Sequence, residues 1–247
     1  RPEAMPVIPD RTQSTTRLGL IVLSTDMATE PDFCRALAGH DVEFHTTRVR
    51  NTNPVTVENL RTMGPKLTDC ASLLLPEMPL DVIAYSCTSG TVALGYNTVA
   101  GQIAAGRGDV PIVTPVTAAL AAFEAIRVSK IALMTPYLQT VGEAVGAYLE
   151  EQGFSIVRQT HLGYASDADM AFIPPDDVRR EAEAADHPDA EALFISCTAL
   201  RAMVGLSALE ATVGKPCLSS IQCLLWQALR EGGYRKPVGN NGSLLER

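Results

Sequence analysis

Long apolar runs are missing from this sequence of 247 residues. None approaches the roughly 18 residues that a membrane-spanning helix needs, so no membrane partner is expected. Residues 1–16 hold three prolines among polar side chains and lack the apolar segment of a secretory signal. We expect them to form a flexible tail, and we expect the protein to be cytoplasmic.

Basic charge is also in short supply, with 20 Lys and Arg against 28 Asp and Glu and a net charge of −8. Nucleic acid is excluded as a partner, because a backbone of phosphates needs a basic face. The apolar fraction of 46% and the charged fraction of 19% are those of an ordinary globular protein. A chain of this length can bury the core of one large domain or of two modest lobes.

Metal and nucleotide motifs are absent too. No two cysteines have C-x-x-C spacing and the four histidines are scattered, so the pattern indicates neither a zinc site nor a disulfide framework. No P-loop and no glycine-rich dinucleotide motif follows the first apolar run. We therefore expect no metal and no organic cofactor. Four cysteines fall within helix or strand patterns and are predicted to be packing residues: Cys34, Cys70, Cys217 and Cys223.

What the sequence does contain is an internal repeat. The tripeptide Ser-Cys-Thr occurs at 86–88 and again at 196–198, each time after a short apolar run. Residues 17–26 also match residues 128–137 at nearly the same offset. A two-copy repeat of this kind predicts two similar lobes with a cleft between equivalent loops.

The pattern of elements is a strict alternation of strands and helices, which predicts an α/β fold with parallel sheets and right-handed crossovers. We expect two pseudo-symmetric lobes, each a parallel four-stranded sheet flanked by helices, with the active site in the cleft between them. The first lobe would comprise 17–115 plus 219–247, and the second 116–218. The expected strands are 18–23, 42–49, 81–85, 111–114, 130–134, 155–161, 190–195 and 216–218. The expected helices are 29–38, one that Thr56 caps, 91–105, 118–126, 138–152, 175–185, 202–212 and 221–230.

Two thiols carry the predicted chemistry. Cys87 and Cys197 each follow a buried strand, where a side chain faces the crevice beyond the carboxyl ends of a parallel sheet. The positive end of a following helix favours thiolate over thiol. Hydroxyls from Thr25 and Tyr137, with backbone N–H groups after each cysteine, suit a carboxylate. The predicted ligand is therefore a small carboxylic acid whose reacting carbon lies between two sulfurs.

These motifs resemble the Asp/Glu racemase superfamily. The resemblance rests on the segments 18–22, 86–90, 135–137 and 196–201, and it extends from Arg17 to Trp226. Within the superfamily the chain is most similar to the branch of maleate cis–trans isomerases, which also holds arylmalonate decarboxylase and the ectoine-utilisation proteins. Segments 53–64 and 133–137 are most similar to the ectoine-utilisation type.

The resemblance implies a cofactor-independent cis–trans isomerase of a small unsaturated carboxylic acid, either maleate-like or derived from ectoine. Cys87 would add to the alkene, the covalent adduct would rotate, and Cys197 would give and take the proton. The family also implies a homodimer or a higher homo-oligomer. It places four side chains on the carboxylates of the substrate: Thr88, Ser89, Tyr137 and Thr198.

Alternatives stay open at this stage. The same thiol pair could serve a two-base racemase of amino-acid or hydantoin type, or the scaffold could bind a small metabolite without turning it over. Decarboxylases of the branch keep only the second cysteine, so Cys87 counts against that activity.

Asp26 departs from the asparagine of maleate isomerases at this position. An ionised aspartate would repel a carboxylate, which would favour an amino- or amide-bearing acid as the substrate. Alternatively, Asp26 caps the following helix.

Overall fold

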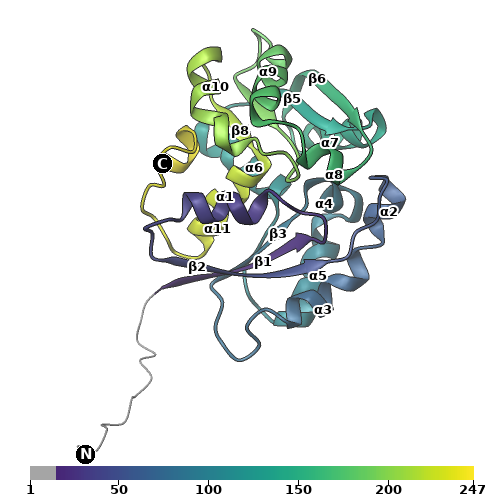
Figure 1. Ribbon diagram of the computed structural model, residues 1–247, viewed down its shortest axis with the longest axis vertical. Helices are drawn as coiled ribbons and strands as arrows, with labels where there is room; N and C mark the ends of the chain where they lie inside the picture. The colour runs from purple at the N-terminus through teal and green to yellow at the C-terminus, as the bar shows by residue number, and fades with distance from the viewer. Residues whose placement is uncertain (1–14) are drawn as a thin grey trace, which may run out of the picture.

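The computed structural model describes residues 15–247 and consists of two parallel sheets with helices packed around them (Figure 1). Residues 1–14 of the predicted tail lie outside the described residues, and strand β1 already begins at Thr16. The first sheet has the order β2-β1-β3-β4 and the second the order β6-β5-β7-β8, so the two halves share one topology. This arrangement confirms the predicted α/β fold of two four-stranded sheets. The strands are β1 (Thr16–Leu23), β2 (Val42–Val49), β3 (Val82–Ser86), β4 (Ile112–Val113), β5 (Lys130–Tyr137), β6 (Ser155–Tyr164), β7 (Ala192–Ile195) and β8 (Cys217–Ser219).

The helices follow the predicted alternation with three differences. The helix expected over 91–105 is divided at Gly95, whose φ of 82° is left-handed and favours glycine. Helices α3 and α8 were not predicted. The helices are α1 (Thr29–Ala36), α2 (Val57–Arg61), α3 (Leu67–Ser72), α4 (Thr88–Leu94), α5 (Tyr96–Arg107), α6 (Pro115–Ile126), α7 (Gln139–Glu151), α8 (Asp167–Ala171), α9 (Pro175–Ala185), α10 (Leu206–Val213) and α11 (Ser220–Glu231).

The last strand of each sheet leads into a helix through the same local device. Thr114, directly after β4, and Ser219, the last residue of β8, each accept a hydrogen bond from the backbone N–H three residues on, and the side chain at that third position bonds back. This reciprocal capping box fixes the helix start next to the strand end. Equivalent positions in the two halves therefore reach the same edge of their sheets.

Helices α6 and α11 tie the two halves together. In α6, which follows the first sheet, Phe123 packs edge-to-face against Phe154 and Phe194 of the second half. Helix α11, which follows the second sheet, lies against β3 and α1 of the first (Figure 1). The backbone N–H of Ser243, near the C-terminus, donates to the Glu210 carboxylate on α10. The lobe boundaries given above stay a prediction.

Three of the four predicted packing cysteines are buried, but Cys34 is exposed. The prediction was wrong for Cys34 because α1 buries the face that carries Phe33 and Ala36, and Cys34 lies on the other side. Within residues 15–247 there is no cluster of His, Cys, Asp or Glu arranged to hold a metal ion. No helix of that part of the chain has the length and apolarity to cross a membrane.

Candidate active site

A small cavity lies where the carboxyl ends of the central strands of both sheets meet. The space between its lining residues, open solvent included, is about 280 Å³. Seven of the eight predicted site residues line it, and Thr88 does not. The lining residues are Leu23, Thr25, Asp26, Cys87, Ser89, Tyr137, Asp167, Cys197, Thr198 and Ala199. None of these ten side chains is basic.

Cys87 is held by the start of a helix. It is the N-cap of α4, and its Sγ accepts a hydrogen bond from the backbone N–H of Gly90 at 3.2 Å. A Cβ added at Gly90 would lie 2.7 Å from that sulfur and 2.9 Å from the hydroxyl of Tyr85. Glycine is therefore required at position 90 for the thiol to sit against the helix start.

Cys197 occupies the equivalent place in the second sheet but has a different backbone. Its φ of 150° is rare for any residue with a side chain, and such strain is concentrated at functional sites. Its Sγ accepts a hydrogen bond from the backbone N–H of Ala199 at 3.2 Å. Helix α10 begins only at Leu206, so the predicted helix start directly after the cysteine exists for Cys87 alone.

Both thiols are neutral in the ligand-free protein. Burial raises the pKa of Cys87 and of Cys197 to about 12, and the nearby Asp167 carboxylate adds to both increases. Hydrogen bonds from backbone N–H groups lower these pKa values, but by less. The helix start does favour the thiolate of Cys87, as expected, but the loss of hydration on burial outweighs it.

Two hydroxyls lie near the sulfurs. Ser89 lies near Cys87 and favours its thiolate, and the phenol of Tyr137 lies near Ser89 and Cys197. Burial, followed by the two thiols, raises the pKa of Tyr137 well above its usual value. Tyr137 is therefore a neutral hydroxyl group at the end of β5, near Ser89 and both thiols.

The two threonines that follow the cysteines hold the halves together. Thr198 Oγ1 donates to the carbonyl oxygen of Ser86 at 3.0 Å, across the cleft. Thr88 Oγ1 lies 2.8 Å from Ser220 Oγ, which also accepts the backbone N–H of Cys197 at 3.0 Å. Thr88 is buried on Ser220 and does not line the cavity, and its predicted contact with a carboxylate stays a prediction.

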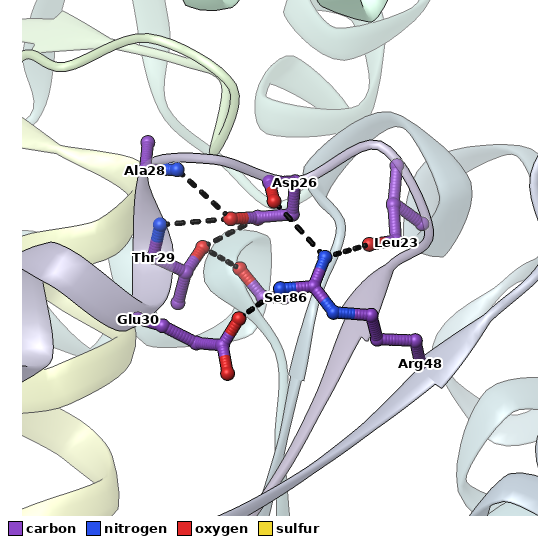
Figure 2. Close-up of polar contacts among 7 residues, drawn as sticks. All are labelled: Leu23, Asp26, Ala28, Thr29, Glu30, Arg48 and Ser86. Atoms are coloured by element: carbon purple, nitrogen blue, oxygen red, sulfur yellow. Dashed lines mark hydrogen bonds and ion pairs between the residues drawn. The ribbon is translucent and has the colours of Figure 1, made fainter.

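Asp26 caps helix α1 (Figure 2). Its Oδ1 accepts the backbone N–H groups of Ala28 and Thr29 at 3.0 and 2.9 Å, and its Oδ2 accepts the Thr29 hydroxyl at 2.7 Å. The capping alternative therefore describes this carboxylate, although Asp26 also borders the cavity. Burial raises the pKa of Asp26, and these hydrogen bonds oppose the increase.

The turn that carries Asp26 is fixed from two sides (Figure 2). Arg48 on β2 donates to the carbonyl oxygens of Leu23 and Asp26 at 3.2 and 3.0 Å, and it pairs with Glu30. The Thr29 hydroxyl, whose proton goes to Asp26, lies 2.8 Å from Ser86 Oγ. Ser86 must therefore donate to Thr29, and this chain links the cap to the residue before Cys87.

Asp167 is the site residue that the sequence analysis missed. It is 6% exposed and lies at the start of the unpredicted helix α8. Its Oδ2 accepts Asn51 Nδ2 at 2.7 Å and Thr25 Oγ1 at 3.3 Å. Asn51 and Asp167 follow β2 and β6, so the rule that located the cysteines, polar residues just beyond parallel strands, could have located this pair.

The fold and the paired thiols define a class of two-sheet α/β proteins with a cleft site. A sequence profile of the arylmalonate decarboxylase family matches residues 69–245. The chain belongs to that family.

Known relatives align with this chain over nearly their whole length and have the same fold. The maleate isomerase of Nocardia farcinica is 29% identical over 240 residues, which cover 93% of this chain and 95% of that protein. The structure of Nocardia farcinica maleate cis–trans isomerase bound to Tris has a TM-score of 0.85 at 27% identity and covers 94% of this chain and 98% of that one. A cysteine-to-serine mutant of that isomerase, solved with a covalently bound succinylcysteine intermediate, has a TM-score of 0.85 at 26% identity with the same coverage.

Proposed function

We propose that this protein is a cofactor-independent cis–trans isomerase of a small unsaturated carboxylic acid. The observation that carries the proposal is that Cys87 and Cys197, from equivalent strand ends of two sheets, line one small cavity. The relatives support it, because several of them are named maleate isomerases and one was trapped as a succinylcysteine intermediate.

In the proposed reaction Cys87 is the nucleophile. Its Sγ forms a bond to one alkene carbon while the π electron pair takes a proton from Cys197 at the neighbouring carbon. The former double bond is then single, so the adduct rotates about it. In the reverse step Cys197 takes that proton back from the carbon while its own proton returns to the departing sulfur of Cys87, which restores the alkene in the trans form. The addition and the elimination need no oxidant, reductant or cofactor, because atoms and electrons balance between the substrate and the two thiols.

The proton that Cys87 loses has a route through the site. Because the pKa of Cys87 is about 12, the thiol has to give up its proton as the carbon–sulfur bond forms. In this proposal the hydroxyls of Ser89 and Tyr137, which line the cavity near the two thiols, carry it toward Cys197, which becomes short of a proton in the same step. Thr25 and Thr198 border the carboxylates of the substrate.

The alternative activities differ from the isomerase in the role of the two thiols. A racemase would use the same pair as two bases on opposite faces of a carbon, without a covalent adduct. A decarboxylase, the activity for which the family is named, is disfavoured by the presence of Cys87. The assignment to the ectoine-utilisation branch, the homo-oligomer and the cytoplasmic location stay predictions.

The proposal is tested by following the conversion of maleate and of its monoamide by proton NMR. Wild-type protein is compared with Cys87→Ser and Cys197→Ser, and Cys34→Ser, on the exposed face of α1, is the control. We expect each site variant to lose at least a thousand-fold in rate and the control to be unchanged. Turnover that survives the loss of Cys87 would reject the isomerase mechanism.

A further inference from the structure

The cavity has an unbalanced charge. Its lining contains two carboxylates, those of Asp26 and Asp167, and no lysine, arginine or histidine. A dicarboxylate such as maleate would bring two more negative charges into this small, buried space. The carboxylates of the substrate and of the protein would repel one another strongly there, because little water is present to screen their charges.

The two carboxylates are not equivalent. Both oxygens of Asp26 accept hydrogen bonds from the start of α1, so its charge is compensated by the helix. Asp167 uses only Oδ2, for Asn51 and Thr25, and its Oδ1 accepts no hydrogen bond from any residue among 15–247. Since Asp167 borders both the cavity and the two thiols, Oδ1 is a free acceptor for a ligand.

Asn51 and Thr25 favour the ionised form of Asp167. Both donate to the carboxylate, and Asn51 itself is held by Ser24 Oγ, which donates to Asn51 Oδ1 at 2.7 Å. The amide of Asn51 is thus oriented with its N–H₂ group toward the aspartate. Burial and Asp26 raise the pKa of Asp167, and these two donors oppose the increase.

We propose that Asp167 determines the specificity of the site, and that the acid it takes carries a nitrogen donor, an amide or an ammonium group, where a dicarboxylate carries its second carboxylate. The proposal rests on the proposed function, because it concerns the substrate of the same cavity. One end of the substrate, a carboxylate, meets the neutral hydroxyls of the site. The other end donates an N–H to Asp167 Oδ1, so that the buried charge gains a partner.

The test separates binding from chemistry. Succinate and its monoamide, succinamate, have no alkene and cannot react with Cys87, and they differ only in one carboxylate against one amide. Their dissociation constants are measured by calorimetry at pH 7 for wild-type protein, Asp167→Asn and Asp169→Asn. Asp169, two residues further along α8, is exposed and outside the cavity, so it is the matched control for charge.

We expect wild-type protein to bind succinamate at least ten-fold more tightly than succinate. In Asp167→Asn the ratio should move at least ten-fold toward succinate, because the amide of the new asparagine can donate to the second carboxylate of succinate. In Asp169→Asn the ratio should be unchanged. A wild-type preference for succinate, or a ratio that Asp167→Asn does not change, would overturn the proposal. A preference for succinamate without any turnover of maleamate or maleate would reject the isomerase and leave the role of Asp167 standing.

Discussion

Single residues determine the chemistry of this site, and their backbone conformations are as informative as their side chains. Cys87 has an ordinary extended φ of −151°, whereas Cys197 has a φ of 150°. The repeat in the sequence predicted two equivalent cysteines, but it could not predict this difference. The local conformation of Cys197 depends on contacts between the halves, such as the hydrogen bond from its backbone N–H to Ser220.

The backbone of Cys197 gives a first prediction. At an ordinary position alanine is more stable than glycine by roughly 0.5–1 kcal/mol, but a φ of 150° costs a residue with a Cβ about 1–3 kcal/mol. We therefore expect Cys197→Gly to be at least as stable as Cys197→Ala in urea unfolding. Ala192, buried in strand β7, supplies the control, since Ala192→Gly should be less stable than the alanine that stands there. An alanine advantage of the same size at both positions would refute the assignment of strain.

Gly90 gives a second prediction. A Cβ there would lie 2.7 Å from the Cys87 sulfur, so Gly90→Ala must displace the thiol or the helix start. We expect a loss of at least a hundred-fold in turnover with the fold retained, as judged by circular dichroism. Gly101→Ala on α5 is the control, because a Cβ at Gly101 meets no atom within 4 Å. Full activity in Gly90→Ala would show that the sulfur position is not critical.

The pH dependence of thiol reactivity gives a third prediction. With a pKa of about 12, Cys87 and Cys197 are protonated at neutral pH, and only the thiolate is alkylated. Their iodoacetamide labelling in the Cys34→Ser background should therefore keep rising, about ten-fold per pH unit, from pH 7 to pH 10. Peptide mass spectrometry gives the rate at each cysteine. A plateau below pH 9 would mean that burial does not control the ionisation of these thiols.

At the scale of elements, side-chain caps such as Asp26 fix the turns that join a strand to the next helix. The sequence predicted most strands and helices because their apolar runs are buried between two layers of helices, and the strand over 42–49 and the helix over 175–185 have the predicted bounds. Helix α8 was missed because it is only five residues long and has no apolar period to reveal it. Asp167 was missed with it, since the strand before it, β6, continues to Tyr164, beyond the predicted end at 161.

The cap of α1 gives a prediction at this scale. Asp26→Ala removes the acceptor of two backbone N–H groups and of the Thr29 hydroxyl, so we expect a loss of about 1–2 kcal/mol in the free energy of unfolding. Glu30→Gln, which removes only a partly exposed partner of Arg48, should cost less than about 1 kcal/mol. Equal losses in the two variants would contradict the role of Asp26 as the cap.

At the scale of the whole molecule, duplication accounts for the position of the site. Two copies of one topology place equivalent strand ends opposite each other, and the repeat alone was enough to predict a cleft with a thiol from each half. The sequence could not show that Thr88 would contact Ser220 instead of the cavity, because that contact is made between segments 132 residues apart. The resting ionisation of the thiols could not be predicted from the sequence either, since it depends on their burial between the halves.

The proposed isomerase activity depends on covalent addition of Cys87 to the substrate and on proton transfer by Cys197. The most direct measurement is the intact mass of the Cys197→Ser variant after incubation with maleate and with maleamate, followed by peptide mapping. We expect a mass gain equal to the acid that is bound, located on Cys87 and absent from the Cys87→Ser/Cys197→Ser double variant. No mass gain with an acid that wild-type protein isomerises, or a gain located on another cysteine, would contradict the claim.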